Sequence, residues 1–249
     1  MSRMIWVVLG KIIKTFYIKA RIEGLNKVLR GTNAVVVANH LGSFGPLAMM
    51  SPLTDKLYPW VVHEVTDLKT CAAYIRRDFV ERELKLRSFV SRELSLIIGR
   101  ICVRLMNDLK AIPVYRRSRD VLKTFEISLG YLKSKKALLV FPENNESKRS
   151  DELCLLNTGF IRLARWLYDT THRVLTFYPV AINKKVRRIR VGQPIRFDPS
   201  NSYGEERIRI KEHLERSISG MYRALEREKA EAAAAHQPHR RHKVHEQAA

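Results

Sequence analysis

Short runs of apolar residues recur along the chain, and polar turns bound each of them. Residues 34–38 and 137–141 are continuously apolar, which is typical of strands buried on both faces of a sheet. Residues 17–23 alternate between apolar and polar positions, and residues 60–65 and 174–182 are rich in β-branched and aromatic side chains. The pattern predicts a strand in each of these segments.

A second pattern places apolar residues three or four positions apart, as on one face of a helix. It covers residues 83–107, 118–133, 155–168 and 205–231, and a shorter helix is expected at 46–50. Strands that alternate with helices along a chain form a mainly parallel sheet with helical cover. We therefore predict an α/β fold whose mainly parallel sheet is covered by helices.

Residues 1–18 carry apolar and basic side chains on opposite sides of one predicted helix. Lys11 and Lys14 lie three positions apart and share the polar face. The apolar face consists of Ile5, Leu9, Ile12, Ile13 and Phe16. Because the apolar run is shorter than the roughly 20 residues that cross a bilayer, we predict an amphipathic helix that lies in the membrane interface. A helix that packs on the protein itself is the alternative.

Composition bounds the number of domains and the class of partner. The 249 residues, 45% of them hydrophobic, are enough for one core, so we assign residues 19–231 to a single domain. Residues 232–249 are rich in Ala and His and poor in large apolar residues, which predicts a flexible tail. The formal net charge of +21 favours anionic lipid or nucleic acid as a partner. The 3 cysteines are scattered singly, which fits a reducing cytosol and suggests neither a disulfide framework nor a metal site.

Two predicted strands end at residues that can carry out proton chemistry. His40 follows the apolar run 34–38, and Glu143 follows the run 137–141. Open α/β sheets place their sites in loops at the carboxyl ends of parallel strands, and a histidine there can act as a base near neutral pH. A structural histidine and an ordinary loop acid are the alternatives.

Four segments around these residues form an ordered set of motifs. They are Asn39-His40-Leu41-Gly42-Ser43-Phe44-Gly45-Pro46, Ala111-Ile112-Pro113-Val114-Tyr115-Arg116, Phe141-Pro142-Glu143-Asn144-Asn145-Glu146-Ser147 and Phe177-Tyr178-Pro179-Val180-Ala181-Ile182. Together they resemble the four blocks of the lysophospholipid and glycerol-phosphate acyltransferase family, which includes 1-acylglycerol-3-phosphate acyltransferases. The first block of that family reads N-H-x-x-x-x-D and the third reads F-P-E-G-T-R-S. Here Gly45 stands in place of the aspartate, and Asn144 and Glu146 stand in place of the third-block glycine and arginine.

The resemblance implies a glycerolipid acyltransferase-like fold and a transfer of a fatty acyl chain from an acyl thioester to a lipid hydroxyl. His40 would be the general base. The acid that orients this histidine in the family is missing. A backbone carbonyl could replace it, and among the nearby acids Asp55, Glu64 and Asp67 we favour Asp67, for which a helix cap or a surface acid is the alternative reading. If His40 is the base and its orienter has moved, Gly45→Asp is expected to leave activity equal or higher.

The same resemblance assigns Arg116 and Glu143 to substrate binding. We add Asn39 and Ser43 of the first block, and Lys148 and Arg149 as replacements for the missing third-block arginine. Guanidinium and ammonium groups suit a phosphate-bearing, lysophospholipid-type acceptor. The acyl donor would be acyl-CoA or acyl carrier protein as a co-substrate, with no cofactor and no metal. We expect a peripheral, monotopic protein on the cytoplasmic face of an anionic membrane.

Basic residues at 184–190 favour the same location, because each basic group near an anionic bilayer contributes about 1 kcal/mol. A solubilising hairpin is the alternative reading of this segment. A homologue that binds lipid or acyl carrier without transfer is a second functional reading, motivated by the missing acid. Nucleic acid is disfavoured as a partner, because the chain has no zinc spacing, RNA-binding aromatic block or helix-turn-helix signature.

Overall fold

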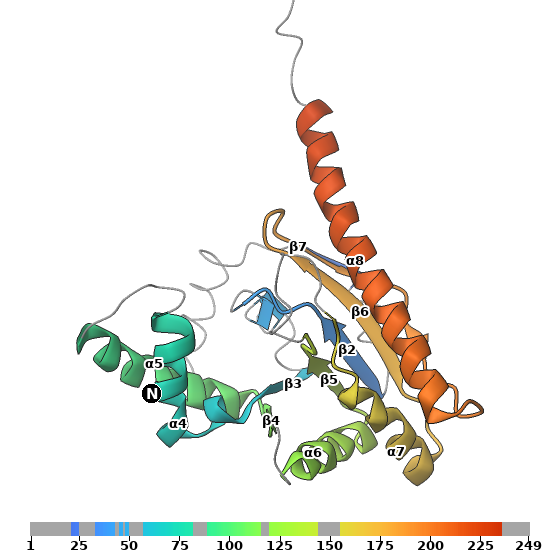
Figure 1. Cartoon of the computed structure of the whole chain (residues 1–249), viewed down its shortest axis with the longest axis horizontal. Helices are drawn as coiled ribbons and strands as arrows, with labels where there is room; N and C mark the ends of the chain where they lie inside the picture. The colour runs from blue at the N-terminus through green and yellow to red at the C-terminus, as the bar shows by residue number, and fades with distance from the viewer. Residues whose placement is uncertain are drawn as a thin grey trace, which may run out of the picture.

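A central sheet with helices packed on it forms the body of the protein (Figure 1). The computed structural model describes residues 21–24, 33–42, 45–46, 48–49, 57–81, 89–115, 120–143 and 155–235. The predicted interfacial helix at 1–18 lies outside these residues. So do the predicted tail residues from 236 onward.

Within the described residues the sheet has 8 strands, in the order β1-β7-β6-β2-β5-β3-β4, with β8 paired to β6. The strands are β1 Arg21–Glu23, β2 Ala34–Ala38, β3 Leu57–Val62, β4 Ile112–Val114, β5 Ala137–Val140, β6 Thr176–Asn183, β7 Arg188–Val191 and β8 Ile195–Arg196. All pairs are parallel except those of β6 with β7 and β8. The predicted α/β class with a mainly parallel sheet is therefore confirmed.

Most of the helices lie where the spacing of apolar residues predicted them, and their first and last residues differ in places. They are α4 Leu68–Ile75, α5 Phe89–Asp108, α6 Val121–Lys133, α7 Arg162–Thr171 and α8 Tyr203–Ala235. α7 begins later than predicted, because Leu156 instead forms a β-bridge with Glu143. α8 continues through Ala235, so residues 232–235 belong to a helix and not to the predicted tail.

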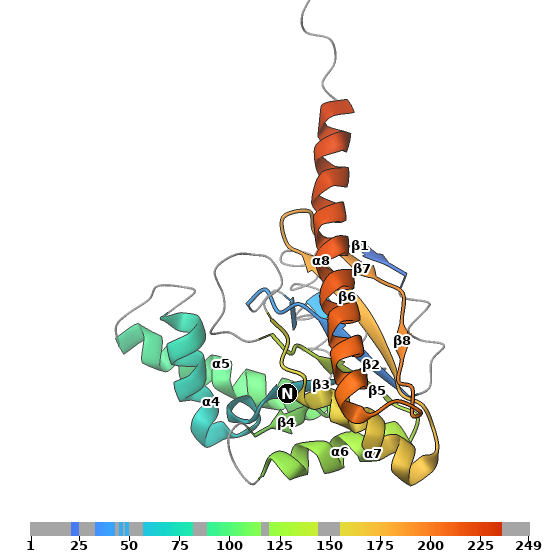
Figure 2. The ribbon, with the colours of Figure 1, turned by 45° about the vertical axis from the view of Figure 1, so that its right-hand side comes forward.

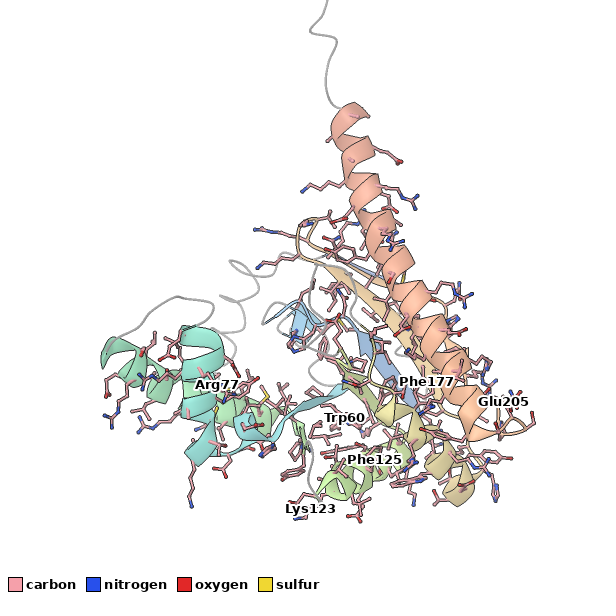
Figure 3. All side chains as sticks on the ribbon, in the orientation of Figure 1. Trp60, Arg77, Lys123, Phe125, Phe177 and Glu205 are labelled. Atoms are coloured by element: carbon pink, nitrogen blue, oxygen red, sulfur yellow. The ribbon has the colours of Figure 1, made fainter. Side chains whose placement is uncertain are left out.

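The two faces of the sheet have different cores. On one face, α6, α7 and α8 pack against β2, β5 and β6 (Figure 2). Trp60 of β3 points toward Phe125 of α6, with 5.9 Å between their ring centroids (Figure 3). On the other face, Val36, Leu139 and Tyr178 pack with Ala48 and Met49, which follow β2 in a short helical segment. Side chains alternate between the faces along each strand, so neighbouring residues enter different cores.

α4 and α5 form a helical unit beside the β3–β4 edge of the sheet (Figure 1). It has its own core, in which Cys71, Val103 and Met106 are buried. Gly99 of α5 allows close packing, because a Cβ there would lie 3.2 Å from the Cα of Ala72. The periodic pattern of apolar residues did not predict α4, although a helix cap was the alternative reading of Asp67.

An ion-pair network joins the first strand, the β6–β7 hairpin and the last helix. Arg188 and Arg190 of β7 each bind Glu23 of β1 and Glu228 of α8. Hydrogen bonds from Arg190 and Arg188 lower the pKa of Glu228 to about 2. These arginines were counted in the basic cluster expected to face anionic lipid, but their charges are compensated within the protein.

We expect Glu228→Gln to lower the melting temperature by an amount that depends on pH. The folded-state pKa of Glu228 is depressed from 4.5 to about 2, so its contribution to stability is present above pH 4.5 and is lost as pH falls toward 2. The difference in melting temperature between wild type and variant should therefore shrink across this window. Glu231→Gln, an exposed carboxylate on the same helix, is the control. A difference that stays constant down to pH 2 would contradict the role of the ion pairs.

Candidate active site

The carboxyl ends of β2, β5, β3 and β4 lie at one edge of the sheet, because these strands are parallel neighbours. His40 lies two residues beyond β2, and Glu143 follows β5 after Phe141 and Pro142. His63 follows β3 directly, and Tyr115 follows β4 directly. The fold thus brings the two predicted functional loops to the same edge.

Asn39 holds the end of β2 against β6. Its side-chain Nδ2 donates a hydrogen bond to the carbonyl oxygen of Ile182 at 2.9 Å, and its Oδ1 accepts one from the Ile182 amide at 2.7 Å. The residue is 1% exposed, which leaves little of it to contact a substrate. The structure thus gives Asn39 a structural role where the sequence predicted substrate binding, because its amide group extends the strand pairing.

His40 is half-buried, and its ring packs at the end of the sheet core. The ring meets Phe141 of the neighbouring chain segment edge-on, with 5.4 Å between centroids and 80° between planes. Its Nδ1 is buried, so the part of the ring that carries Nε2 is the one that can meet a substrate. A base with this orientation needs the proton on Nδ1, which a hydrogen-bond acceptor on that side would secure.

Glu143 is an acid in a buried position, since only 6% of it is exposed. Its backbone is held by the β-bridge to Leu156 and by the neighbouring hydrogen bond from the Asn157 amide to the Pro142 carbonyl at 2.8 Å. Leu156 is in turn bound to α8, where its amide donates to Glu215 Oε1 at 2.9 Å. A carboxylate buried at the end of a parallel strand is costly unless polar groups stabilise it, which favours a specific role over an ordinary loop acid.

Gly45 packs directly against the backbone of the histidine loop. A Cβ at this position would lie 2.2 Å from the carbonyl oxygen of His40 and 3.1 Å from that of Asn39. Backbone atoms cannot give way as a flexible side-chain end can, so any side chain here requires the loop to move. This corrects the expectation that Gly45→Asp would leave activity equal or higher, because the loop has no room for the aspartate.

Asp67 has a structural role that was the alternative reading of this residue. It is the N-cap of α4, where its Oδ1 accepts a hydrogen bond from the Lys69 amide at 2.8 Å. The side chain is exposed. β3, which leads to Asp67, is separated from β2 by β5 in the sheet. A role for Asp67 beside the imidazole stays a prediction, and the capping bond is what the structure shows.

Several predicted binding residues lie outside the described part of the chain. They are Ser43, Arg116, Lys148 and Arg149. Arg116 directly follows Tyr115 at the end of β4, and Lys148 and Arg149 come a few residues after Glu143. Their chain segments therefore leave the sheet at the edge where His40 lies, and contact with a substrate stays a prediction for all of them.

A second histidine at this edge was not predicted. The His63 ring stacks on Tyr115, with 5.1 Å between centroids and 30° between planes, and its Nδ1 lies 3.1 Å from Glu64 Oε2. The stack connects the ends of β3 and β4 directly ahead of Arg116. The sequence pattern could have identified His63, because this residue follows an apolar strand much as His40 does.

Two further findings concern the described residues as a whole. Within them, no group of three or more His, Cys, Asp and Glu side chains is arranged to bind a metal ion. None of the helices described combines the length and hydrophobicity that a membrane span needs.

The fold is similar to that of a known acyltransferase structure. The 1-acyl-sn-glycerophosphate (LPA) acyltransferase PlsC from Thermotoga maritima superposes with a TM-score of 0.52 at 16% sequence identity, over 89% of this chain and 77% of that one. At this identity the similarity shows the fold. The sequence matches no protein-family model and no curated protein.

We expect Gly45→Ala to destabilise the protein, because even one methyl group overlaps the His40 carbonyl. Forced shifts of this kind cost about 1 to 3 kcal/mol, and Gly45→Asp should cost at least as much. Gly130→Ala in α6 is the control, since nothing lies within 4 Å of a Cβ there and alanine favours a helix by up to about 1 kcal/mol. Denaturant unfolding of the three variants measures the difference. Equal stability of Gly45→Ala and wild type would show that the loop is not tightly packed.

Proposed function

We propose that the protein is an O-acyltransferase that moves a fatty acyl chain from an acyl thioester to the hydroxyl of a lysophospholipid or related glycerolipid, with His40 as general base. The observation that carries the proposal is the placement of His40 at the carboxyl end of β2, next to the strand end that bears Glu143. The fold shared with PlsC of Thermotoga maritima supports it. The ordered motifs around these residues support it as well.

In the proposed reaction, Nε2 of His40 removes the proton of the acceptor hydroxyl as its oxygen attacks the thioester carbonyl carbon. The tetrahedral intermediate collapses when the carbon–sulfur bond breaks. The leaving thiolate takes the proton back from the imidazolium, which leaves an ester and a free thiol. The half-buried ring with a buried Nδ1 suits this task, because the substrate then meets the other nitrogen.

The acceptor is proposed to carry a phosphate, because basic residues follow in sequence the strand ends at this sheet edge. Arg116 follows β4, and Lys148 and Arg149 follow Glu143. Arginine can bind a phosphate through two parallel hydrogen bonds, which would hold the acceptor hydroxyl in a fixed position. The donor is proposed to be acyl-CoA or acyl carrier protein, since transfer from a thioester needs no cofactor.

We propose that the protein works at the cytoplasmic surface of an anionic membrane. The net charge of +21 and the amphipathic pattern of residues 1–18 support this location. The exposed turn after β6 adds Lys184 and Arg187 at the edge where His40 lies. The charges of Arg188 and Arg190 contribute less, because Glu23 and Glu228 compensate them.

We expect His40→Ala to lower acyl transfer by about 10²- to 10⁴-fold, the usual contribution of a general base. The assay uses a labelled acyl thioester and lysophosphatidic acid on membranes or mixed micelles. The matched control is His213→Ala on α8, outside the candidate site. The Nε2 of this ring lies 3.0 Å from the backbone oxygen of Gln193.

Comparable transfer by His40→Ala and wild type would refute the proposed base. Lipid or acyl-thioester binding by wild type with no transfer would instead support the second reading, a homologue that binds without catalysis. That reading is supported by Gly45, because its tight packing against His40 leaves no room in the loop for the acid of the first block.

We expect the protein to bind vesicles of anionic phospholipid more tightly than zwitterionic vesicles, and binding should weaken as salt rises. Removal of residues 1–18 should weaken vesicle binding, whereas removal of residues 236–249 is the control for loss of a terminal segment. Sedimentation with vesicles measures both effects. Tighter binding to DNA or RNA than to anionic vesicles at the same salt concentration would contradict a membrane location.

A further inference from the structure

We propose that the carboxylate of Glu143 orients the His40 imidazole, in the role that the acid of the first block has in the family that the sequence resembles. Its catalytic consequence rests on the function proposed above. The geometric part concerns only how two side chains of neighbouring strands are placed. Glu143 would be a positioning residue, acting through His40 and not on the substrate.

The register of β2 and β5, extended past their last paired residues, sets the two residues side by side. β2 and β5 are parallel, and Val35, Val36 and Val37 pair with Leu138, Leu139 and Val140. Continued by the same step, the register sets His40 opposite Glu143. Neighbouring strands lie about 4.8 Å apart, so the two backbones are within reach of a side-chain contact.

The chain beyond the last paired residues stays close enough for this register to hold. The His40 ring contacts the Phe141 ring at 5.4 Å, and Phe141 lies between the end of β5 and Glu143. Asn39 is fixed to β6, and the β-bridge to Leu156 fixes Glu143. Both segments are therefore anchored on their outer sides and confined next to each other.

The two side chains also belong to the same face of the sheet. Val36 and Ala38 of β2 and Leu139 of β5 are in one core, against which Phe141 packs. Side chains alternate along a strand, so His40 continues the series of Val36 and Ala38, and Glu143 continues that of Leu139 and Phe141. The contact between the His40 and Phe141 rings agrees with this assignment.

The chemistry of Glu143 matches what the imidazole needs. Nδ1 of His40 is buried, and a buried ring nitrogen is normally satisfied by a polar group. A carboxylate that accepts a hydrogen bond from Nδ1–H, directly or through one water, keeps the proton on Nδ1 and leaves Nε2 unprotonated as the base. Such catalytic hydrogen bonds are often long in the substrate-free state and tighten in the complex.

Gly45 explains why the acid must come from another segment. A side chain at position 45 would collide with the His40 backbone, so the loop itself cannot supply the carboxylate. Among the described residues, the other charged groups at this edge include Lys184 and Arg187 after β6 and the pair His63 and Glu64 after β3. Glu64 is one strand further from β2 than Glu143 and lies against His63.

The direct test measures the pKa of His40 by NMR titration of the imidazole in the full chain. A neighbouring carboxylate raises a histidine pKa, so Glu143→Gln should lower it by about one pH unit or more. Glu143→Asp, which keeps the charge, should retain much of the wild-type value. Glu64→Gln is the matched control for loss of an acid at the same edge, and Asp67→Asn tests the rival orienter while keeping a good helix cap.

Kinetics separate orientation of the base from binding of the acceptor. If Glu143 orients His40, Glu143→Gln lowers kcat and leaves the KM of the acceptor nearly unchanged. The equivalent change in serine proteases lowers kcat by about 10⁴-fold. The acidic limb of the kcat/KM profile should also move to lower pH, since it follows the pKa of the base. A rise in acceptor KM with an unchanged profile would overturn the inference and would assign Glu143 to acceptor binding.

The outcomes distinguish failure of the inference from failure of the proposed function. The inference is overturned if Glu143→Gln leaves the His40 pKa unchanged, or if Asp67→Asn lowers that pKa instead. Both outcomes hold whether or not the protein transfers acyl groups. If Glu143→Gln lowers the His40 pKa but the wild type shows no His40-dependent transfer, the pairing of the two residues is supported and the proposed acyltransferase function is refuted.

Discussion

The parallel pairing of β2 with β5 and β6 is the constraint on which the candidate site depends. It sets the ends of two buried strands side by side, so that residues about one hundred positions apart in sequence share one sheet edge. Asn39 extends this pairing past the last residue of β2 by binding both backbone groups of Ile182. The position of His40 is thereby determined by the sheet, and less by the loop that follows it.

α8 supports two segments next to this edge. α8 crosses the sheet (Figure 2), and its buried stripe includes Ile210, Leu214 and Ile218. The same helix contributes Glu215, which binds Leu156, and Glu228, which binds Arg188 and Arg190. One helix therefore supports both the segment that pairs with Glu143 and the hairpin that follows β6. A substitution in α8 that breaks these contacts would therefore alter the site indirectly, without changing a residue of the site.

The sequence predicted the features that follow from local patterns. Apolar runs located β2 and β5, and the alternation of strands and helices indicated a mainly parallel sheet, because both depend on residues close together in the chain. The β-bridge of Leu156, the ion pair of Arg188 with Glu23 and the contact of Gly45 with His40 join segments that are brought together only by the tertiary fold. No spacing rule encodes them. The cap at Asp67 was the alternative reading of that acid, whereas α4 itself is too short to give a clear periodic signal.

Gly45 and Glu143 are best understood together. An acid placed a few residues after a histidine must fold back toward the ring, which requires a loop wide enough for its side chain, and here the backbone of Gly45 fills that space against the His40 carbonyl. An acid on the adjacent parallel strand needs no such loop, because the register itself brings it alongside. Burial strengthens the interaction of a carboxylate with an imidazolium, and Glu143 is buried. A sheet of this kind can therefore supply an orienting carboxylate from β5 when the loop after β2 is too tight to carry one.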